Sequence, residues 1–199
     1  MSLFIESILV RNGELPLLPW HTKRFNRTRQ LQLGITSEID LSILHELADP
    51  PATGLFKCRI VYSHDIQLIE FVPYHIRKIH SLRLVEDDTI DYFFKSTDRE
   101  HLKQLFAQRS MDDDILIVKN GFLTDTYYSN VVLENEEGLF TPETYLLHGV
   151  RRMQLLATKQ IQTATIRPED LPRFQRIHLI NAMMDLGDCV LNVADVYKR

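Results

Sequence analysis

Residues 92–99, Tyr-Phe-Phe-Lys-Ser-Thr-Asp-Arg, constrain the fold of this chain more than any other stretch. An apolar run over residues 90–94 predicts a short buried strand, and it ends at a single lysine, Lys95. Thr97 and Glu100 have the spacing of a capping box, so we expect a helix to begin directly after the lysine. Lys95 is therefore predicted to lie at a strand-to-helix junction behind aromatic residues.

Lys95 has two interpretations at such a junction. A lysine held beside aromatic side chains loses solvation, which lowers its pKa and makes it a nucleophile toward carbonyl groups. Lysine is nevertheless almost always exposed, and a lysine at a strand end can extend its amine to solvent. This stretch alone favours the exposed lysine, so the choice between the two interpretations depends on the rest of the chain.

The composition excludes several classes of protein. The chain has 199 residues, of which 44% are hydrophobic and 25% charged, as in an ordinary soluble globular protein. A net charge of −4 argues against a general nucleic-acid binder, and no apolar run is long enough to cross a membrane. The N-terminus lacks a signal-peptide pattern. Cys58 and Cys189 have no metal or redox spacing, so we expect a cytoplasmic protein without a metal site.

Hydrophobic periodicity predicts an α+β fold with two domains. The linker at residues 73–78 separates a small domain, residues 1–75, from a larger strand-rich domain, residues 76–199, which would carry Lys95. The predicted helices are residues 20–33, 37–48, 150–162 and the one after Lys95. The predicted strands are residues 4–10, 15–18, 55–62, 66–72, 81–85, 90–94, 115–118, 122–124, 131–134, 139–141, 164–167 and 177–180.

Two groups of cations have open interpretations. Lys57 and Arg59 alternate with apolar residues, so both side chains leave the same face of their strand. They could keep an edge strand soluble or bind a substrate carboxylate, and the sequence does not separate these roles. The helix over residues 20–33 is basic, and His21 and Arg24 share one face of it. A solvated basic face explains Lys23, Arg27 and Arg29 better than nucleic-acid binding, because aromatic residues do not interleave with them.

Six short motifs follow one another along nearly the whole chain. They are Glu6-Ser7-Ile8, Asn12-Gly13, His21-Thr22-Lys23-Arg24, Lys95-Ser96-Thr97-Asp98-Arg99, Leu123-Thr124-Asp125 with Ser129-Asn130, and Thr141-Pro142 with Leu147-His148-Gly149-Val150-Arg151-Arg152. Their order resembles that of the class IV aminotransferases, fold-type IV enzymes that use pyridoxal 5′-phosphate and include branched-chain and D-amino-acid aminotransferases and 4-amino-4-deoxychorismate lyase. Asn181-Ala182-Met183-Met184 is similar to a stretch of the lyase.

The resemblance implies a site for pyridoxal phosphate. Lys95 would form a Schiff base with the cofactor aldehyde and then act as general acid and base. Asp125 would hold the protonated pyridine nitrogen, and Arg24 would bind the phosphate. The amides at the helix start, Val150 and Arg151, would also face the phosphate. Leu147, Asn181 and Ala182 are further candidate cofactor contacts. The candidate substrate residues are Lys57, Arg59, Tyr74, Arg99 and Tyr128, with Arg99 near the phenolic oxygen of the cofactor ring.

Within the family, the asparagine-alanine stretch and the lysine motif resemble the lyase most. The expected reaction converts 4-amino-4-deoxychorismate to 4-aminobenzoate and pyruvate, on the folate route. The alternatives are an aminotransferase for branched-chain or D-amino acids and a non-catalytic relative. The chain departs from the family at Asp125, where glutamate is usual, and in the short loop at residues 63–65. The resemblance also implies a homodimer that acts on a small amine or amino acid.

Overall fold

The computed structural model describes residues 2–197. The chain folds into two compact units. The first unit contains Met1–Ile76 and Phe94–Asp98, and the second contains Arg77–Phe93 and Arg99–Arg199. The division after residue 76 lies one residue from the boundary that the sequence predicts. Lys95, however, belongs to the first unit, whereas the sequence predicts it in the second domain.

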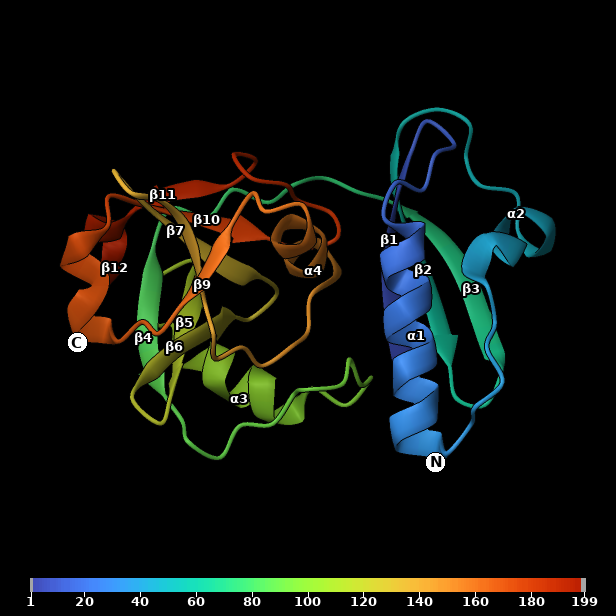
Figure 1. Ribbon diagram of the computed structural model, residues 1–199, viewed down its shortest axis with the longest axis horizontal. Helices are drawn as coiled ribbons and strands as arrows, with labels where there is room; N and C mark the ends of the chain where they lie inside the picture. Colours follow the sequence, from blue (N-terminus) through green and yellow to red (C-terminus); the bar gives the residue numbers. More distant parts are fainter. Residues whose placement is uncertain (1, 198–199) are drawn as a thin grey trace. The chain divides into compact units, whose positions relative to one another are not determined.

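The first unit is a three-stranded antiparallel sheet with the strand order β1-β2-β3 and a long helix, α1, across one face (Figure 1). Its elements are β1 (Phe4–Arg11), α1 (Leu18–Leu33), the 3-10 helix η1 (Leu41–Ile43), α2 (Leu44–Leu47), β2 (Leu55–Tyr62) and β3 (Ile66–Pro73). Phe25 of α1 packs on Tyr62 with their ring centroids 4.2 Å apart, and Ile8 and Ile60 belong to the same buried core. The sheet and α1 therefore share one hydrophobic interior.

Two predictions in the first unit are wrong. Residues 15–18 form a turn and the start of α1 rather than a strand, because Pro16 and Pro19 cannot donate to a strand ladder and Pro19 suits a first helical turn. The predicted helix over residues 37–48 is reduced to the short helices η1 and α2. Asp40 caps η1 by accepting from the Ser42 amide, so the helical turn begins there and not at Ser37. The predicted end of α1 is confirmed, because Gly34 caps it with a φ of 70°.

The segment around Lys95 is not the strand and capped helix that the sequence predicts. Residues 90–94 form no strand, because the Asp87 carboxylate accepts hydrogen bonds from the amides of Thr89 and Ile90 and bends the chain. The helix α3 (Glu100–Ala107) follows, but its N-cap is Arg99 and it has no side-chain cap. The predicted capping box is therefore wrong.

The backbone of Lys95 is instead bound to the first strand of the chain. The Ile5 amide donates to the Lys95 carbonyl at 2.9 Å, and Phe4 and Ser96 form an isolated antiparallel bridge. Thr97 contributes both its amide and its hydroxyl to the Leu3 carbonyl. The Lys95 segment thus extends the edge of β1.

The second unit is built on a nine-stranded mixed sheet with the main order β11-β10-β7-β6-β5-β4-β12, and β8 and β9 continue from β7 (Figure 1). Besides α3, its helices are α4 (Val150–Ala157) and the 3-10 helices η2 (Pro168–Arg173) and η3 (Val193–Asp195). The strands are β4 (Leu82–Glu86), β5 (Asp114–Lys119), β6 (Phe122–Thr126), β7 (Asn130–Asn135), β8 (Gly138–Pro142), β9 (Gln162–Ala164), β10 (Arg176–Ile180), β11 (Val190–Asn192) and β12 (Val196–Tyr197).

Most strands of this unit are confirmed, and the α+β class is confirmed with them. The Asn120-Gly121 hairpin joins β5 to β6 with positive φ at both residues, 53° and 78°. Two predicted elements have wrong bounds. The helix predicted over residues 150–162 ends at Ala157, and the strand predicted over residues 164–167 lies earlier, at β9.

Three general features of the described residues concern partners and ligands. No helix between residues 2 and 197 is long and apolar enough to cross a membrane. The same residues contain no group of three or more His, Cys, Asp and Glu side chains that could hold a metal ion. Cys58 and Cys189 are both free and buried, and burial raises the pKa of each thiol, to about 12 for Cys58. Burial thus disfavours the thiolate form of both cysteines.

Candidate functional site

The first unit contains a buried group of three charged or polar side chains. Glu6 projects from β1 into the core face, where His21 and Arg24 meet it from α1. Arg24 donates from Nε to Oε1 of Glu6 at 2.9 Å and from Nη2 to Oε2 at 2.6 Å. His21 Nδ1 lies 2.5 Å from the same Oε2. The three-residue spacing of His21 and Arg24 places both on one face of α1, so one carboxylate serves both.

The protonation states follow from burial and charge. Burial alone would raise the pKa of Glu6, but the charge of Arg24 and the hydrogen bonds from both partners lower it to about 2. Burial lowers the pKa of His21, and the charges of Arg24 and Lys95 lower it further, against the effect of Glu6. His21 is therefore neutral at pH 7 and donates from Nδ1 to Glu6. Its Nε2 is buried without a hydrogen-bond partner among the described residues.

Lys95 belongs to the same unit as this group. Its carbonyl is fixed by β1, and its charge is close enough to His21 to lower the imidazole pKa. The structure therefore brings Lys95 and Arg24, two of the predicted cofactor residues, into the surroundings of one buried histidine. The aromatic residue before Lys95, Phe94, packs against Phe4 with their ring centroids 6.5 Å apart.

The predicted substrate cations lie on the other face of this sheet. Glu6 pairs in register with Ile60, whereas Ser7 pairs with Arg59 and Leu9 with Lys57. Since side chains alternate along a strand, Arg59 and Lys57 point away from the face that carries Glu6. Arg59 is bound to Glu70 of β3 at 2.9 Å. Tyr74 follows β3, and its amide donates to the Leu55 carbonyl.

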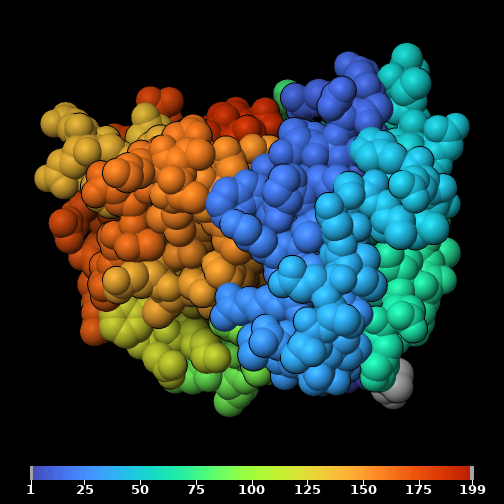
Figure 2. Space-filling model, turned by 45° about the vertical axis from the view of Figure 1, so that its right-hand side comes forward, coloured from blue at the N-terminus to red at the C-terminus, as the bar shows by residue number. Residues whose placement is uncertain are grey.

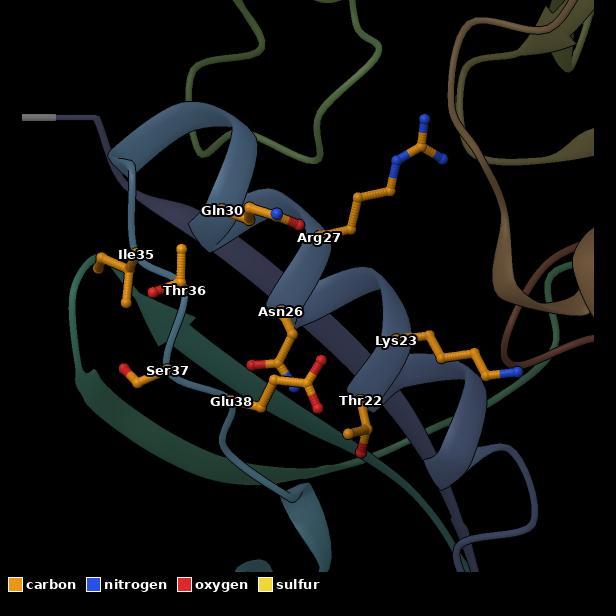
Figure 3. A pocket seen from close by; sticks show the side chains of 9 residues that line it. All are labelled: Thr22, Lys23, Asn26, Arg27, Gln30, Ile35, Thr36, Ser37 and Glu38. Carbon is orange, nitrogen blue, oxygen red and sulfur yellow. The ribbon is translucent and has the colours of Figure 1, made fainter.

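A polar cavity of about 280 Å³ also lies in the first unit, between α1 and the segment after it. Figure 3 shows Thr22, Asn26 and Glu38 near one another at this cavity, while Lys23 and Arg27 extend away from residues 35–38. In the space-filling view, α1 and the light-blue residues after it form a continuous part of the surface of this unit (Figure 2). None of the predicted site residues lines the cavity.

The second unit places Asp125 at the end of β6 as a buried carboxylate with three hydrogen bonds. Oδ1 accepts from Asn130 Nδ2 at 2.9 Å. Oδ2 accepts from the amides of Leu146 and Leu147 at 3.2 Å and 2.9 Å. A carboxylate has about four lone-pair positions, so one position on Oδ1 remains for a further donor.

The charge of this carboxylate is only partly compensated. Burial raises the pKa of Asp125 to about 6, against the lowering effect of its hydrogen bonds and of the Arg152 charge. Arg152 is buried as well, and it donates to Thr141 Oγ1 at 3.2 Å and to the Pro142 carbonyl at 2.8 Å. Among residues 2–197, no cation bonds Asp125 directly, and a protonated heterocyclic nitrogen would supply one.

The helix α4 begins three residues after Leu147, which links Asp125 to a helix N-terminus. Gly149 is the N-cap, and no side chain caps the helix. The amides of the first turn, including Val150 and Arg151, therefore suit an anion. Residues 147–151 thus carry the Leu147 amide, which bonds the Asp125 carboxylate, at one end and the amides of the first turn of α4 at the other.

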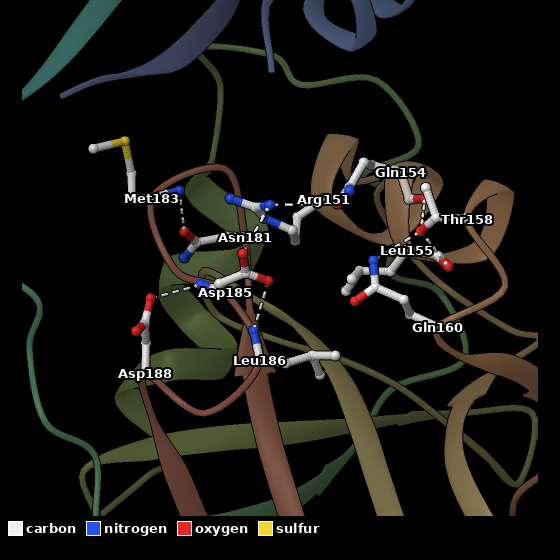
Figure 4. A network of polar contacts seen from close by, with 10 residues as sticks. All are labelled: Arg151, Gln154, Leu155, Thr158, Gln160, Asn181, Met183, Asp185, Leu186 and Asp188. Carbon is white, nitrogen blue, oxygen red and sulfur yellow. Dashed lines mark hydrogen bonds and ion pairs between the residues drawn. The ribbon is translucent and has the colours of Figure 1, made fainter. Parts of the chain in front are cut away.

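Arg151 and Asn181 are brought together at the start of α4 (Figure 4). Arg151 forms an ion pair with Asp185 at 3.0 Å and bonds Gln154 Oε1 at 3.3 Å. Asn181 accepts from the Met183 amide at 2.8 Å and donates to Ser129 Oγ at 3.2 Å. The segment that contains Ala182 is thus bonded to Ser129 through Asn181 and to Arg151 through Asp185.

Arg99 and Tyr128 form an aromatic and cationic cluster in this unit. The Arg99 guanidinium lies 4.3 Å from the Tyr127 ring centroid and 4.6 Å from that of Tyr128, and it donates to the Tyr127 carbonyl at 2.6 Å. Tyr128 is 58% exposed, so its ring is available to a ligand. The structure therefore brings together two of the predicted substrate residues.

Four buried polar residues were missing from the predicted site. Glu6 is a charged residue in an apolar strand, and His21 shares a face with Arg24, so both had a sequence signal. Asn130 and Arg152 stood inside the recognised motifs, but the sequence did not reveal their partners. Side-chain hydrogen bonds between distant segments, such as Asn130 with Leu147, depend on the folded chain.

The comparisons with known proteins establish the family. The family model for amino-transferase class IV matches residues 89–190. An uncharacterized protein of Haemophilus influenzae is 33% identical over 183 residues, which is 91% of this chain and 97% of that protein. The chain belongs to the class IV aminotransferases, as its motifs indicated.

Solved structures agree with this assignment. A proposed 4-amino-4-deoxychorismate lyase from Haemophilus somnus is 30% identical, with a TM-score of 0.85 over 94% of this chain and 98% of that one. A hypothetical aminotransferase from Mycobacterium tuberculosis, solved in a pyridoxal-phosphate-bound form, has a TM-score of 0.75 over 100% of this chain and 84% of its own, at 18% identity. The fold is therefore that of the fold-type IV enzymes.

Proposed function

We propose that this chain is a pyridoxal-phosphate-dependent enzyme and that it acts as a 4-amino-4-deoxychorismate lyase. The observation that carries the proposal is the buried Asp125, which keeps one acceptor position and a raised pKa beside the start of α4. A protonated pyridine nitrogen fits the acceptor, and a phosphate fits the uncapped helix amides. The solved forms of the similar Mycobacterium tuberculosis protein, with pyridoxal phosphate and with pyridoxamine phosphate and α-ketoglutarate, support the same cofactor.

Lys95, Arg24 and Asp125 would hold three different parts of the cofactor. Pyridoxal phosphate supplies an electron-accepting ring when it is bound. Lys95 would hold the cofactor aldehyde, and once the substrate amine had displaced it, the freed Lys95 amine would accept the proton from the amine-bearing carbon of the substrate. Arg24, oriented by Glu6, binds phosphate, and Asp125 keeps the ring nitrogen protonated. Leu147, Val150, Arg151, Asn181 and Ala182 complete the cofactor contacts.

The lyase is favoured over the aminotransferase by the similarity to the Haemophilus somnus protein, at 30% identity over nearly the full length of both chains. The amino group stays on the ring, which becomes aromatic as the proton and pyruvate leave, so the reaction needs no second substrate to accept the amine. Arg99 and Tyr128 would contact the substrate ring and its carboxylates. Lys57, Arg59 and Tyr74 remain substrate candidates as well, although Arg59 is paired with Glu70.

The test is incubation of the purified protein and pyridoxal phosphate with 4-amino-4-deoxychorismate, followed by assay of 4-aminobenzoate and pyruvate. Equal amounts of both products are expected without any added oxo acid. Turnover that requires an oxo acid would instead identify an aminotransferase for branched-chain or D-amino acids. A Lys95→Ala variant with unchanged product formation would overturn the assignment of Lys95.

A non-catalytic relative would bind the cofactor without turnover, so the product assay distinguishes it from the enzyme. The free buried thiols of Cys58 and Cys189 favour a cytoplasmic protein, where a place on the folate route would be expected. A homodimer is proposed by analogy with the family, and sedimentation analysis tests it.

A further inference from the structure

Asn130 contacts both Asp125 and the segment that leads into α4. The proposed function assigns Asp125 to the ring nitrogen of the cofactor and the start of α4 to its phosphate. Asp125 and Asn130 are the cross-strand pair at which β6 meets β7. The side-chain amide of Asn130 donates to Asp125 Oδ1 at 2.9 Å and to the Leu147 carbonyl at 3.0 Å. Leu147 returns a hydrogen bond from its own amide to Asp125 Oδ2 at 2.9 Å. Asp125, Asn130 and Leu147 therefore form a closed set of contacts.

Because Gly149 has no side chain, it leaves room for the side chain of Asn130. Its φ of −67° and ψ of 135° are open to any residue, so glycine is not required there by backbone conformation. A Cβ at this position would lie 1.8 Å from Asn130 Oδ1, and the three nearest atoms all belong to the Asn130 side chain. The N-cap of α4 and the asparagine amide are thus in close contact.

We propose that Asn130 is a positioning residue, which sets the Asp125 carboxylate at a fixed distance from the first turn of α4. This proposal rests on the proposed function, because the carboxylate and the helix amides would serve the ring nitrogen and the phosphate of the same cofactor. Asp125 is one methylene shorter than the glutamate usual in the family. Asn130 and the Leu146 and Leu147 amides orient this shorter acid, and the Asn130 contact with Gly149 relates its position to α4.

The first experiment measures the acid itself, in protein free of cofactor. The Asp125 carboxyl is titrated by carbon-13 NMR, with Asp125→Asn used to assign its signal. Asn130→Ala removes one hydrogen bond to the ionised form, so the pKa of Asp125 should rise further, by roughly one pH unit. The matched control is Asn135→Ala in the same strand, whose side chain accepts from the Glu137 amide and should leave that pKa unchanged. An unchanged Asp125 pKa in Asn130→Ala would overturn the proposal.

The second experiment separates positioning from general loosening. Binding of pyridoxamine 5′-phosphate and of inorganic phosphate is measured by calorimetry for the wild-type protein and Asn130→Ala. Pyridoxamine phosphate should bind roughly tenfold more weakly to the variant, whereas phosphate alone should bind equally to both. Equal weakening of both ligands would mean that Asn130 only supports the fold. A wild-type protein that binds no pyridoxamine phosphate would overturn the proposed function, and the NMR titration would still decide whether Asn130 acts on Asp125.

The third experiment tests the contact with the helix start. Gly149→Ala should lower Tm in the wild-type background, because its methyl group collides with the Asn130 side chain. In Asn130→Ala the collision is removed, so the double variant should melt close to Asn130→Ala alone. Additive losses of Tm would show that the two positions act independently and would contradict the proposed coupling.

Discussion

Arg24 holds Glu6 with two nitrogens, with Nε 2.9 Å from Oε1 and Nη2 2.6 Å from Oε2. Both side chains are buried, and such a bidentate pair fixes the orientation of the guanidinium plane. The cation proposed to bind phosphate is therefore oriented by the Glu6 carboxylate. We therefore expect substitution of Glu6 to lower stability and substitution of Arg24 to weaken phosphate binding.

Substitution of Glu6 tests the stability of this group. Glu6→Gln leaves the Arg24 guanidinium buried without its counter-charge, which should lower the free energy of unfolding by about 3 kcal/mol or more at pH 7. Urea denaturation measures the loss. The control is Glu70→Gln, which breaks the partly exposed pair with Arg59 and should cost less than about 1 kcal/mol. Equal losses in both variants would contradict the importance of burial.

The same carboxylate predicts a pH dependence. The pKa of Glu6 in the folded chain is about 2, below its ordinary value of 4.5. A lowered pKa stabilises the fold above pH 4.5, and the stabilisation is lost as the pH falls toward 2. The difference in unfolding free energy between the wild-type protein and Glu6→Gln should therefore shrink over this range. A difference that stays constant down to pH 2.5 would mean that Glu6 is not ionised in the folded chain.

Substitution of Arg24 tests the phosphate role. Arg24→Gln should weaken binding of pyridoxal phosphate at least tenfold, because one charge-assisted contact to phosphate is lost. Binding of pyridoxal, which lacks the phosphate, should change much less. Both affinities can be measured by fluorescence titration. A similar loss for the two ligands would place Arg24 away from the phosphate.

Substitution of Lys95 tests covalent attachment of the cofactor. Lys95→Ala should abolish the visible absorbance that arises when pyridoxal phosphate bonds to a lysine, while circular dichroism stays that of the wild-type protein. Lys103→Ala, in α3 with a side chain 63% exposed, is the control and should keep the absorbance. Retention of the band in Lys95→Ala would show that another amine carries the cofactor.

Asp125 should show the opposite pH dependence to Glu6. Burial raises its pKa from 3.8 to about 6, so the cost of ionising it in the folded chain appears as the pH rises from 4 through 6. The stability of Asp125→Asn relative to the wild-type protein should therefore improve by about 2 kcal/mol between pH 4 and pH 8. The variant should also bind pyridoxal phosphate more weakly. A relative stability independent of pH would contradict the raised pKa.

The sequence predicted most strands because their alternation and their Asn-Gly turn at residues 120–121 are local signals. It failed at residues 90–94, where the Asp87 side chain takes the amides that a strand would need. It also failed at Thr97, which binds the distant Leu3 carbonyl instead of capping a helix. In both cases a polar side chain forms hydrogen bonds outside the element to which the sequence assigned it.

The candidate site was predicted in part for the same reason. Motif order identified Lys95, Arg24 and Asp125 as a set, but it did not show what surrounds each of them. The buried pairing of Glu6 with His21 and the contact of Asn130 with Gly149 join residues far apart in the sequence. Such contacts depend on the packing of whole elements, which periodicity does not specify.

The assignment of Phe94–Asp98 to the first unit has a consequence for dissecting the protein. Neither unit is one continuous length of chain, so no single cut produces either of them complete. A fragment that stops at Ile76 would leave the Ile5 amide without its acceptor at Lys95 and would lose the proposed nucleophile. A fragment that starts at Arg77 would keep that nucleophile but not the strand that holds it. Modular exchange of either unit between relatives would therefore require two junctions, one on each side of the lysine.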